Sequence, residues 1–224
     1  MEKHTISPRS AFQLELEKLR NSLVAMGTLV EEAMSAAVRS LAERDLNLAR
    51  RVAAGDDEID RRQQEIEEYA WKLLALQQPM AGDLRTIGTA LKIVTDLERM
   101  ADHAVDIAKV TIRLADEPLI KPLVDIPRMA EIAQQMTREA LTAYIHRDAE
   151  IAAHLEDTDH RVDELYNQVF RELLVLMMAD PKCINQATQL LMVALYLERV
   201  ADHATNIGEW VIYMISGERR DLNV

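Results

Sequence analysis

Hydrophobic residues recur at alternating intervals of three and four over most of the chain, and this spacing predicts long helices that pack in a bundle. The first helix is expected to begin after Ser7-Pro8, because proline is tolerated in a first helical turn. Its predicted buried face consists of Phe12, Leu16, Leu19, Leu23, Met26, Val30, Ala33 and Ala37.

A second helix is predicted from a cap at Asp45 to about Gln78, with Gly55 as the candidate position for a bend. Residues 77–82 contain Pro79 and Gly82 and predict a turn. The third helix should follow over about residues 83–115. Its predicted buried face is Leu91, Val94, Leu97, Ala101, Ala104 and Ala108.

Residues 116–127 hold three of the six prolines and mark the expected boundary between two halves. A fourth helix is predicted over about residues 128–146, and a fifth from a cap at Asp148 to about residue 179. After a turn at Asp180-Pro181, the sixth helix should run to Ile215, with Gly217 as its stop. Its predicted buried face is Leu190, Ala194, Leu197, Ala201, Ala204, Gly208, Val211 and Ile215.

The two halves contain related sequences. Residues 96–108 and 196–208 are identical at eight of thirteen positions, at a constant offset of 100. Arg44-Asp45 likewise matches Arg147-Asp148 at an offset of 103. A repeat of this length indicates duplication of a structural unit. The expected fold is therefore all-α, with two tandem three-helix bundles at residues 1–117 and 118–224.

Composition supports helices and narrows the functional classes. Hydrophobic residues make up 49% of the chain but aromatic residues only 4%, a mixture rich in good helix formers. The net charge of −12 argues against nucleic acid or an anionic membrane as a partner, since both attract basic proteins. A single cysteine, Cys183, permits no intrachain disulfide and favours the cytosol. The sequence shows neither a signal peptide nor a membrane span.

Acidic residues of neighbouring helices should lie level with one another. If the helices before and after Pro79 pair antiparallel, level residues have numbers that sum to about 158, which places Glu98 beside Asp60 and Asp102 beside Asp56. The same reasoning around residue 180 places Glu198 beside Asp163 and Asp202 beside Asp159. Asp106 is a candidate fifth carboxylate in the first half, where the second half has Asn206.

Each predicted set of four carboxylates suggests a cation site at the bundle surface. Like charges four residues apart destabilise a helix by roughly 0.2–0.5 kcal/mol per pair, and a hard cation with oxygen ligands would remove that cost. The alternative is an ordinary solvated face, with Arg99 and Arg199 neutralising part of the charge. Because an amide is a weaker ligand than a carboxylate, we expect the half with Asn206 to bind metal less firmly.

The remaining polar residues carry weaker signals. His103 and His203 follow the acidic positions, and successive residues of a helix point about 100° apart. Each is therefore expected to pack against or bond a neighbouring helix, with a role as metal ligand as the alternative. Cys183 is expected to be a small packing residue. The sequence contains no glycine-rich phosphate loop, so any binding of phosphate is expected to be indirect, through a bound cation.

The repeated Leu-Glu-Arg-x-Ala-Asp-His-Ala segment and the turn Gln-Gln-Pro-Met-Ala-Gly-Asp-Leu-Arg at residues 77–85 resemble the PhoU family of phosphate-uptake regulators. The resemblance covers essentially the whole chain. It implies a cytoplasmic, often dimeric, negative regulator of the phosphate-starvation response. It also implies two partners, the ATPase subunit of the phosphate ABC transporter and a sensor histidine kinase, so that contact with the membrane is only through that complex.

The resemblance further implies metal clusters, of Fe, Mn, Mg or Zn, held by the family's acidic motifs. These motifs map onto Asp56, Asp60, Glu98, Asp102, Asp159, Asp163, Glu198 and Asp202. Two other functions remain open at this point. The converging acids alone would suit a metal-dependent redox or hydrolytic enzyme, whereas a purely structural bundle would bind no metal.

Overall fold

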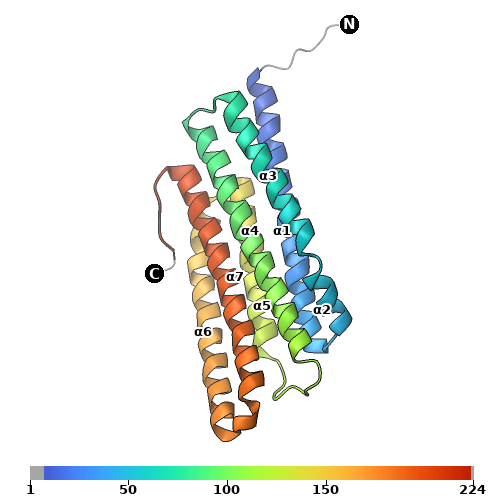
Figure 1. Ribbon diagram of the computed structural model, residues 1–224. Helices are drawn as coiled ribbons and strands as arrows, with labels where there is room; N and C mark the ends of the chain where they lie inside the picture. The colour runs from blue at the N-terminus through green and yellow to red at the C-terminus, as the bar shows by residue number, and fades with distance from the viewer. Residues whose placement is uncertain (1–7, 223–224) are drawn as a thin grey trace.

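The computed structural model describes residues 8–222, which form a bundle of long helices (Figure 1). The first half contains α1 (Pro8–Glu43), α2 (Leu46–Ala53), α3 (Asp56–Gln77) and α4 (Ala81–Arg113). The second half contains α5 (Asp125–His146), α6 (Ala149–Ala179), the short 3₁₀ helix η1 (Pro181–Cys183) and α7 (Ile184–Ser216). The all-α, duplicated architecture predicted from the sequence is confirmed.

The two halves pack against each other mainly through α4 and α7, the last helix of each half. α4 contacts α1, α2 and α3 of its own half, α7 contacts α5 and α6, and α4 and α7 lie against each other. α1 also packs against α5. The buried side chains of both halves therefore form one continuous hydrophobic core, and the faces of α4 and α7 supply much of it.

The helix ends follow local chemistry that the sequence repeats. Asp45 caps α2 by accepting hydrogen bonds from the backbone N–H groups of Asn47 and Leu48, both at 2.9 Å. Asp148 caps α6 in the same way, from Glu150 at 2.9 Å and Ile151 at 3.1 Å. Such caps contribute about 1 kcal/mol each. Gly217 ends α7 at φ +81°, as predicted.

Two predicted boundaries were wrong. The second helix is not continuous and bent, because it breaks at Ala54-Gly55 into α2 and α3. The fourth predicted helix begins at Asp125, three residues earlier than expected. Pro127 is its third residue, where the backbone nitrogen has no partner within the helix, so proline costs no hydrogen bond there.

Close approach of α6 and α7 depends on Gly208. A Cβ at this position would lie 2.7 Å from Cδ1 of Leu155 and 3.1 Å from the backbone oxygen of Ala152. The missing side chain therefore lets the two helices of the second hairpin pack tightly beside the acidic segment.

The single cysteine has the packing role expected from the sequence. Cys183 is partly buried and packs against the core.

Candidate functional site

The first hairpin brings Asp56 and Asp60 of α3 close to Glu98 and Asp102 of α4. The pKa values of Asp56 and Glu98 are raised, first by burial and then by neighbouring carboxylates. Asp60 and Asp102 act on both of these residues. Repulsion of this kind requires proximity, so the four carboxyl groups lie near one another on the neighbouring helices α3 and α4.

The second hairpin repeats this arrangement with Asp159 and Asp163 of α6 and Glu198 and Asp202 of α7. Burial and the charges of Asp163 and Asp202 raise the pKa of Asp159 to about 6. Burial, then Asp202 and Asp163, raise the pKa of Glu198 to about 7. The carboxylates of this half therefore carry the larger electrostatic cost, and Asp159 is itself buried.

Basic side chains offset part of this charge in the first half. Arg99 lies 3.1 Å from an oxygen of Asp102 and 3.5 Å from an oxygen of Glu98. Asp106 lies 3.4 Å from Nζ of Lys109. Arg99 and Lys109 are more than half exposed, so these are surface ion pairs, which contribute little stability.

Oxygen-rich donor sets of this kind suit hard cations such as Mg²⁺, Mn²⁺ or iron. Within residues 8–222, no three His, Cys, Asp or Glu side chains are already arranged to hold one metal ion. Ligation would require the carboxylates to rotate toward one another. The repulsion within each hairpin is the cost that a bound cation would remove, and in this respect the residues fit a metal.

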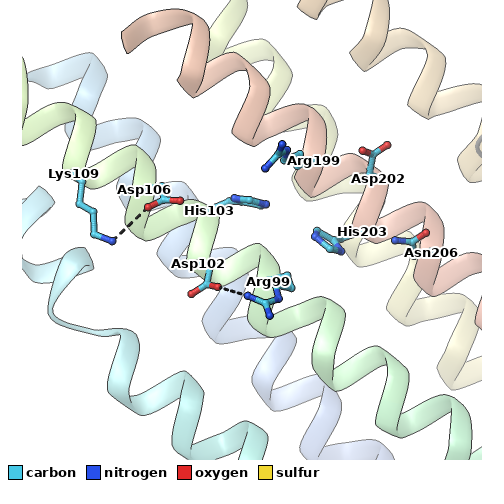
Figure 2. A pocket seen from close by; sticks show the side chains of 9 residues that line it. All are labelled: Arg99, Asp102, His103, Asp106, Lys109, Arg199, Asp202, His203 and Asn206. Atoms are coloured by element: carbon cyan, nitrogen blue, oxygen red, sulfur yellow. Dashed lines mark hydrogen bonds and ion pairs between the residues drawn. The ribbon is translucent and has the colours of Figure 1, made fainter. Parts of the chain in front are cut away.

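A groove of about 730 Å³ lies between α4 and α7, where the two copies of the repeated segment meet. Figure 2 shows His103 and His203 projecting from opposite helices toward its centre, with the Arg99–Asp102 and Asp106–Lys109 pairs along α4. The groove is lined by Arg99, Asp102, His103, Asp106, Lys109, Arg199, Asp202, His203 and Asn206.

The two histidines occupy equivalent positions but have different partners. His203 lies with its Nδ1 2.9 Å from an oxygen of Asp96 on α4. The equivalent of Asp96 in the second half is Tyr196, which stacks on His103 with ring centroids 5.5 Å apart. Nδ1 of His103 is buried and has no hydrogen-bond partner in the described part of the chain. The duplication is therefore asymmetric at this position as well as at Asp106 and Asn206.

The prediction that each histidine contacts a neighbouring helix is thus confirmed. The sequence did not indicate that the two copies of the repeated segment, residues 96–108 and 196–208, lie against each other. Burial, followed by His203 and Arg199, lowers the pKa of His103 to about 4. The exchange of Asp96 for Tyr196 was visible in the repeat. Its consequence depends on the antiparallel contact of α4 with α7, which only the tertiary structure shows.

Comparison with known proteins identifies the family. The family model described as "PhoU domain" matches residues 23–111 and 126–211, one match in each half. The chain belongs to the PhoU family. The two PhoU matches correspond to the two helical halves and include both acidic hairpins.

Relatives named "Phosphate-specific transport system accessory protein PhoU homolog" match along nearly the whole chain. The protein from Clostridium acetobutylicum is 42% identical over 216 residues, which covers 96% of this chain and 99% of that protein. The protein from Pseudomonas aeruginosa is 39% identical over 215 residues, covering 96% and 88%.

Solved PhoU structures share the fold. The crystal structure of PhoU from Pseudomonas aeruginosa matches with a TM-score of 0.88 at 38% identity and covers 92% of this chain and all of that one. The phosphate transport system regulatory protein PhoU from Streptococcus pneumoniae matches with a TM-score of 0.87 at 33% identity, covering 94% and 99%. None of the described helices combines the length and the apolar character needed to cross a membrane.

Proposed function

We propose that this protein is a non-enzymatic negative regulator of phosphate uptake and of the phosphate-starvation response. The observation that carries the proposal is the 42% identity, over 96% of the chain, to an accessory protein of a phosphate-specific transport system. The protein would act in the cytoplasm as an adaptor between the ATPase subunit of the phosphate ABC transporter and a sensor histidine kinase.

The adaptor would act by shifting the conformational populations of its partners. A bound protein changes such an equilibrium only if it binds one state more tightly than the other. We therefore propose that, when phosphate is plentiful, it binds preferentially to the inhibitory state of the kinase and to a resting state of the transporter ATPase. A homodimer would present two copies of the binding surface to this complex.

We propose further that the two acidic hairpins bind divalent or iron-type cations. Asp56, Asp60, Glu98 and Asp102 would hold metal in the first half, and Asp159, Asp163, Glu198 and Asp202 in the second. Asp106 lies one turn beyond Asp102 and would supply a further oxygen. The metal would supply positive charge that relieves the repulsion within each hairpin and fixes the helix surface that faces a partner.

Co-purification tests the adaptor. Tagged protein, expressed with the transporter ATPase subunit and the cytoplasmic part of the kinase, should retain both at high phosphate and less of them under phosphate starvation. Deleting the gene should leave the starvation response active at high phosphate. If the tagged protein retains neither partner, at high phosphate or under starvation, the adaptor role is contradicted.

Elemental analysis of the purified protein tests the metal sites separately. The paired variant Glu98→Gln with Glu198→Gln should lose most of the bound metal, whereas Glu131→Gln, on an exposed part of α5, should retain it. Equal metal content in the unmodified protein, the double variant and Glu131→Gln would exclude these hairpins as the site. Light scattering at known concentration measures whether the protein is a dimer.

A further inference from the structure

A second polar pocket lies away from the acidic hairpins, where four helices end or begin. It has a volume of about 190 Å³ and is formed by the start of α1, the start of α4, the end of α5 and the end of α7. These helix ends lie toward the upper end of the bundle in Figure 1. Because α1 and α4 belong to the first half and α5 and α7 to the second, the pocket spans both halves.

Three arginines line this pocket. Arg9 forms an ion pair with Asp83 at 2.5 Å. Arg20 donates to the backbone carbonyl of Ile145 at 3.1 Å, and Arg147 donates to the hydroxyl of Thr86 at 2.7 Å. The acceptors of Arg20 and Arg147 are neutral, so their positive charge is not balanced by these bonds.

The rest of the lining adds hydrogen-bond donors. Tyr144 is 3% exposed and lies close enough to Arg20 and Arg147 to feel their charges. Burial nevertheless raises the pKa of Tyr144 to about 12, so its hydroxyl remains protonated and can donate. Gln13 supplies an amide, and Asp83 is the one acid among the lining residues. Three arginines against one aspartate leave two positive charges in excess.

The pocket therefore carries an excess of positive charge in a chain whose net charge is −12. Arg9 and Arg147 are exposed, whereas Arg20 is partly buried, and a partly buried charge is costly unless an opposite charge joins it. Guanidinium groups present several N–H donors in a planar fork that matches the oxygens of phosphate and carboxylate groups. The pocket is smaller than the roughly 300–1,000 Å³ of sites for drug-sized ligands.

We propose that this pocket binds a small tetrahedral oxyanion, either free phosphate or the terminal group of a phosphomonoester. Arg20 and Arg147 would supply the charge, Tyr144 and Gln13 would donate further hydrogen bonds, and the Arg9–Asp83 pair would form the rim. Binding would be direct, in contrast to the cation-mediated binding expected from the sequence. Because both halves contribute side chains, an anion in the pocket would also tie the two halves together.

Calorimetry on the full-length protein tests the proposal. The protein is first treated with a chelator, so that no cation at the hairpins can bind the anion, and is titrated separately with inorganic phosphate and with glycerol 3-phosphate. Arg147→Gln should weaken binding about tenfold or more, since it removes a charge-assisted donor. Tyr144→Phe, which keeps the ring in its buried position, should weaken binding about threefold through the loss of one hydrogen bond.

Two matched controls define the result. Arg138→Gln removes an exposed arginine of α5, the helix that Arg147 directly follows; Arg138 pairs with Glu31 at 3.1 Å, and its loss should leave binding unchanged. Glu98→Gln with Glu198→Gln alters the acidic hairpins and should also leave it unchanged. Binding of phosphate identifies a free anion as ligand, and binding of glycerol 3-phosphate alone identifies an ester.

The proposal is overturned if neither compound binds. It is equally overturned if Tyr144→Phe and Arg147→Gln, both folded by circular dichroism, bind as tightly as the unmodified protein. Because the measurement uses one purified protein, its failure is distinct from failure of the adaptor role, which depends on the transporter ATPase and the kinase.

Discussion

Replacing Glu198 by glutamine should stabilise the metal-free protein at alkaline pH. The glutamate is held beside Asp202 and Asp163, and burial together with their charges raises its pKa from 4.5 to about 7. Folding therefore disfavours the ionised form. Glutamine has nearly the same shape and no charge, so Glu198→Gln removes the repulsion while preserving the packing.

The pH dependence has a definite sign. Above pH 7 the carboxyl of Glu198 is ionised in both folded and unfolded protein, so the folded state is destabilised by the full cost of holding the charged form in its buried, acidic surroundings. Below its unfolded value of 4.5 it is neutral in both states and the cost vanishes. Hence the unfolding free energy of the metal-free protein should rise as pH falls from 8 to 5. The full shift corresponds to roughly 3 kcal/mol, but the side chain is only partly buried, and solvent screening reduces the expected gain to about 1 kcal/mol.

Chemical denaturation in the presence of a chelator measures this effect. Glu198→Gln should be more stable than the unmodified protein at pH 8, nearly equal to it at pH 5, and less stabilised by added Mn²⁺. Glu131→Gln, on the exposed part of α5, controls for the general effect of losing a charge. If Glu198→Gln gains nothing at pH 8 without metal, the second hairpin does not carry the repulsion inferred for it.

Three further results are expected. Gly208→Ala should destabilise the protein by about 1 kcal/mol, because overpacking outweighs the higher helix propensity of alanine. Gly88→Ala should stabilise it, because an added Cβ at that position meets nothing within 4 Å. Equal denaturation midpoints for the two variants would contradict this contrast. Asn206→Asp should raise the metal content of the second half, measured by elemental analysis in a protein whose first site is removed. The imidazole of His103 should remain neutral at pH 5, because burial and the nearby positive charges lower its pKa to about 4; a nitrogen chemical shift that titrates near pH 6.5 would contradict it.

The acidic hairpins show how much a one-dimensional pattern can determine. The helical period fixes which side chains share a stripe, and a short turn fixes which residues of adjacent antiparallel helices are level. Glu98 and Asp60 were placed together on these two grounds alone, and in the structure Asp60 is among the carboxylates that raise the pKa of Glu98, after burial and Asp102. Gly55 was predicted as the position of a bend, but the helix ends there and a new one begins at Asp56.

The sequence by itself determined the helices, the duplication and the acidic hairpins, since each depends on residues that are near in the chain or joined by one turn. Only the tertiary structure decided how the halves meet. The groove containing His103 and His203 requires α4 to lie against α7, and the arginine pocket joins residues 61 to 125 positions apart, such as Arg147 with Thr86 and Arg20 with Ile145. Such contacts follow from the burial of whole helix faces in a shared core, and no local spacing encodes them.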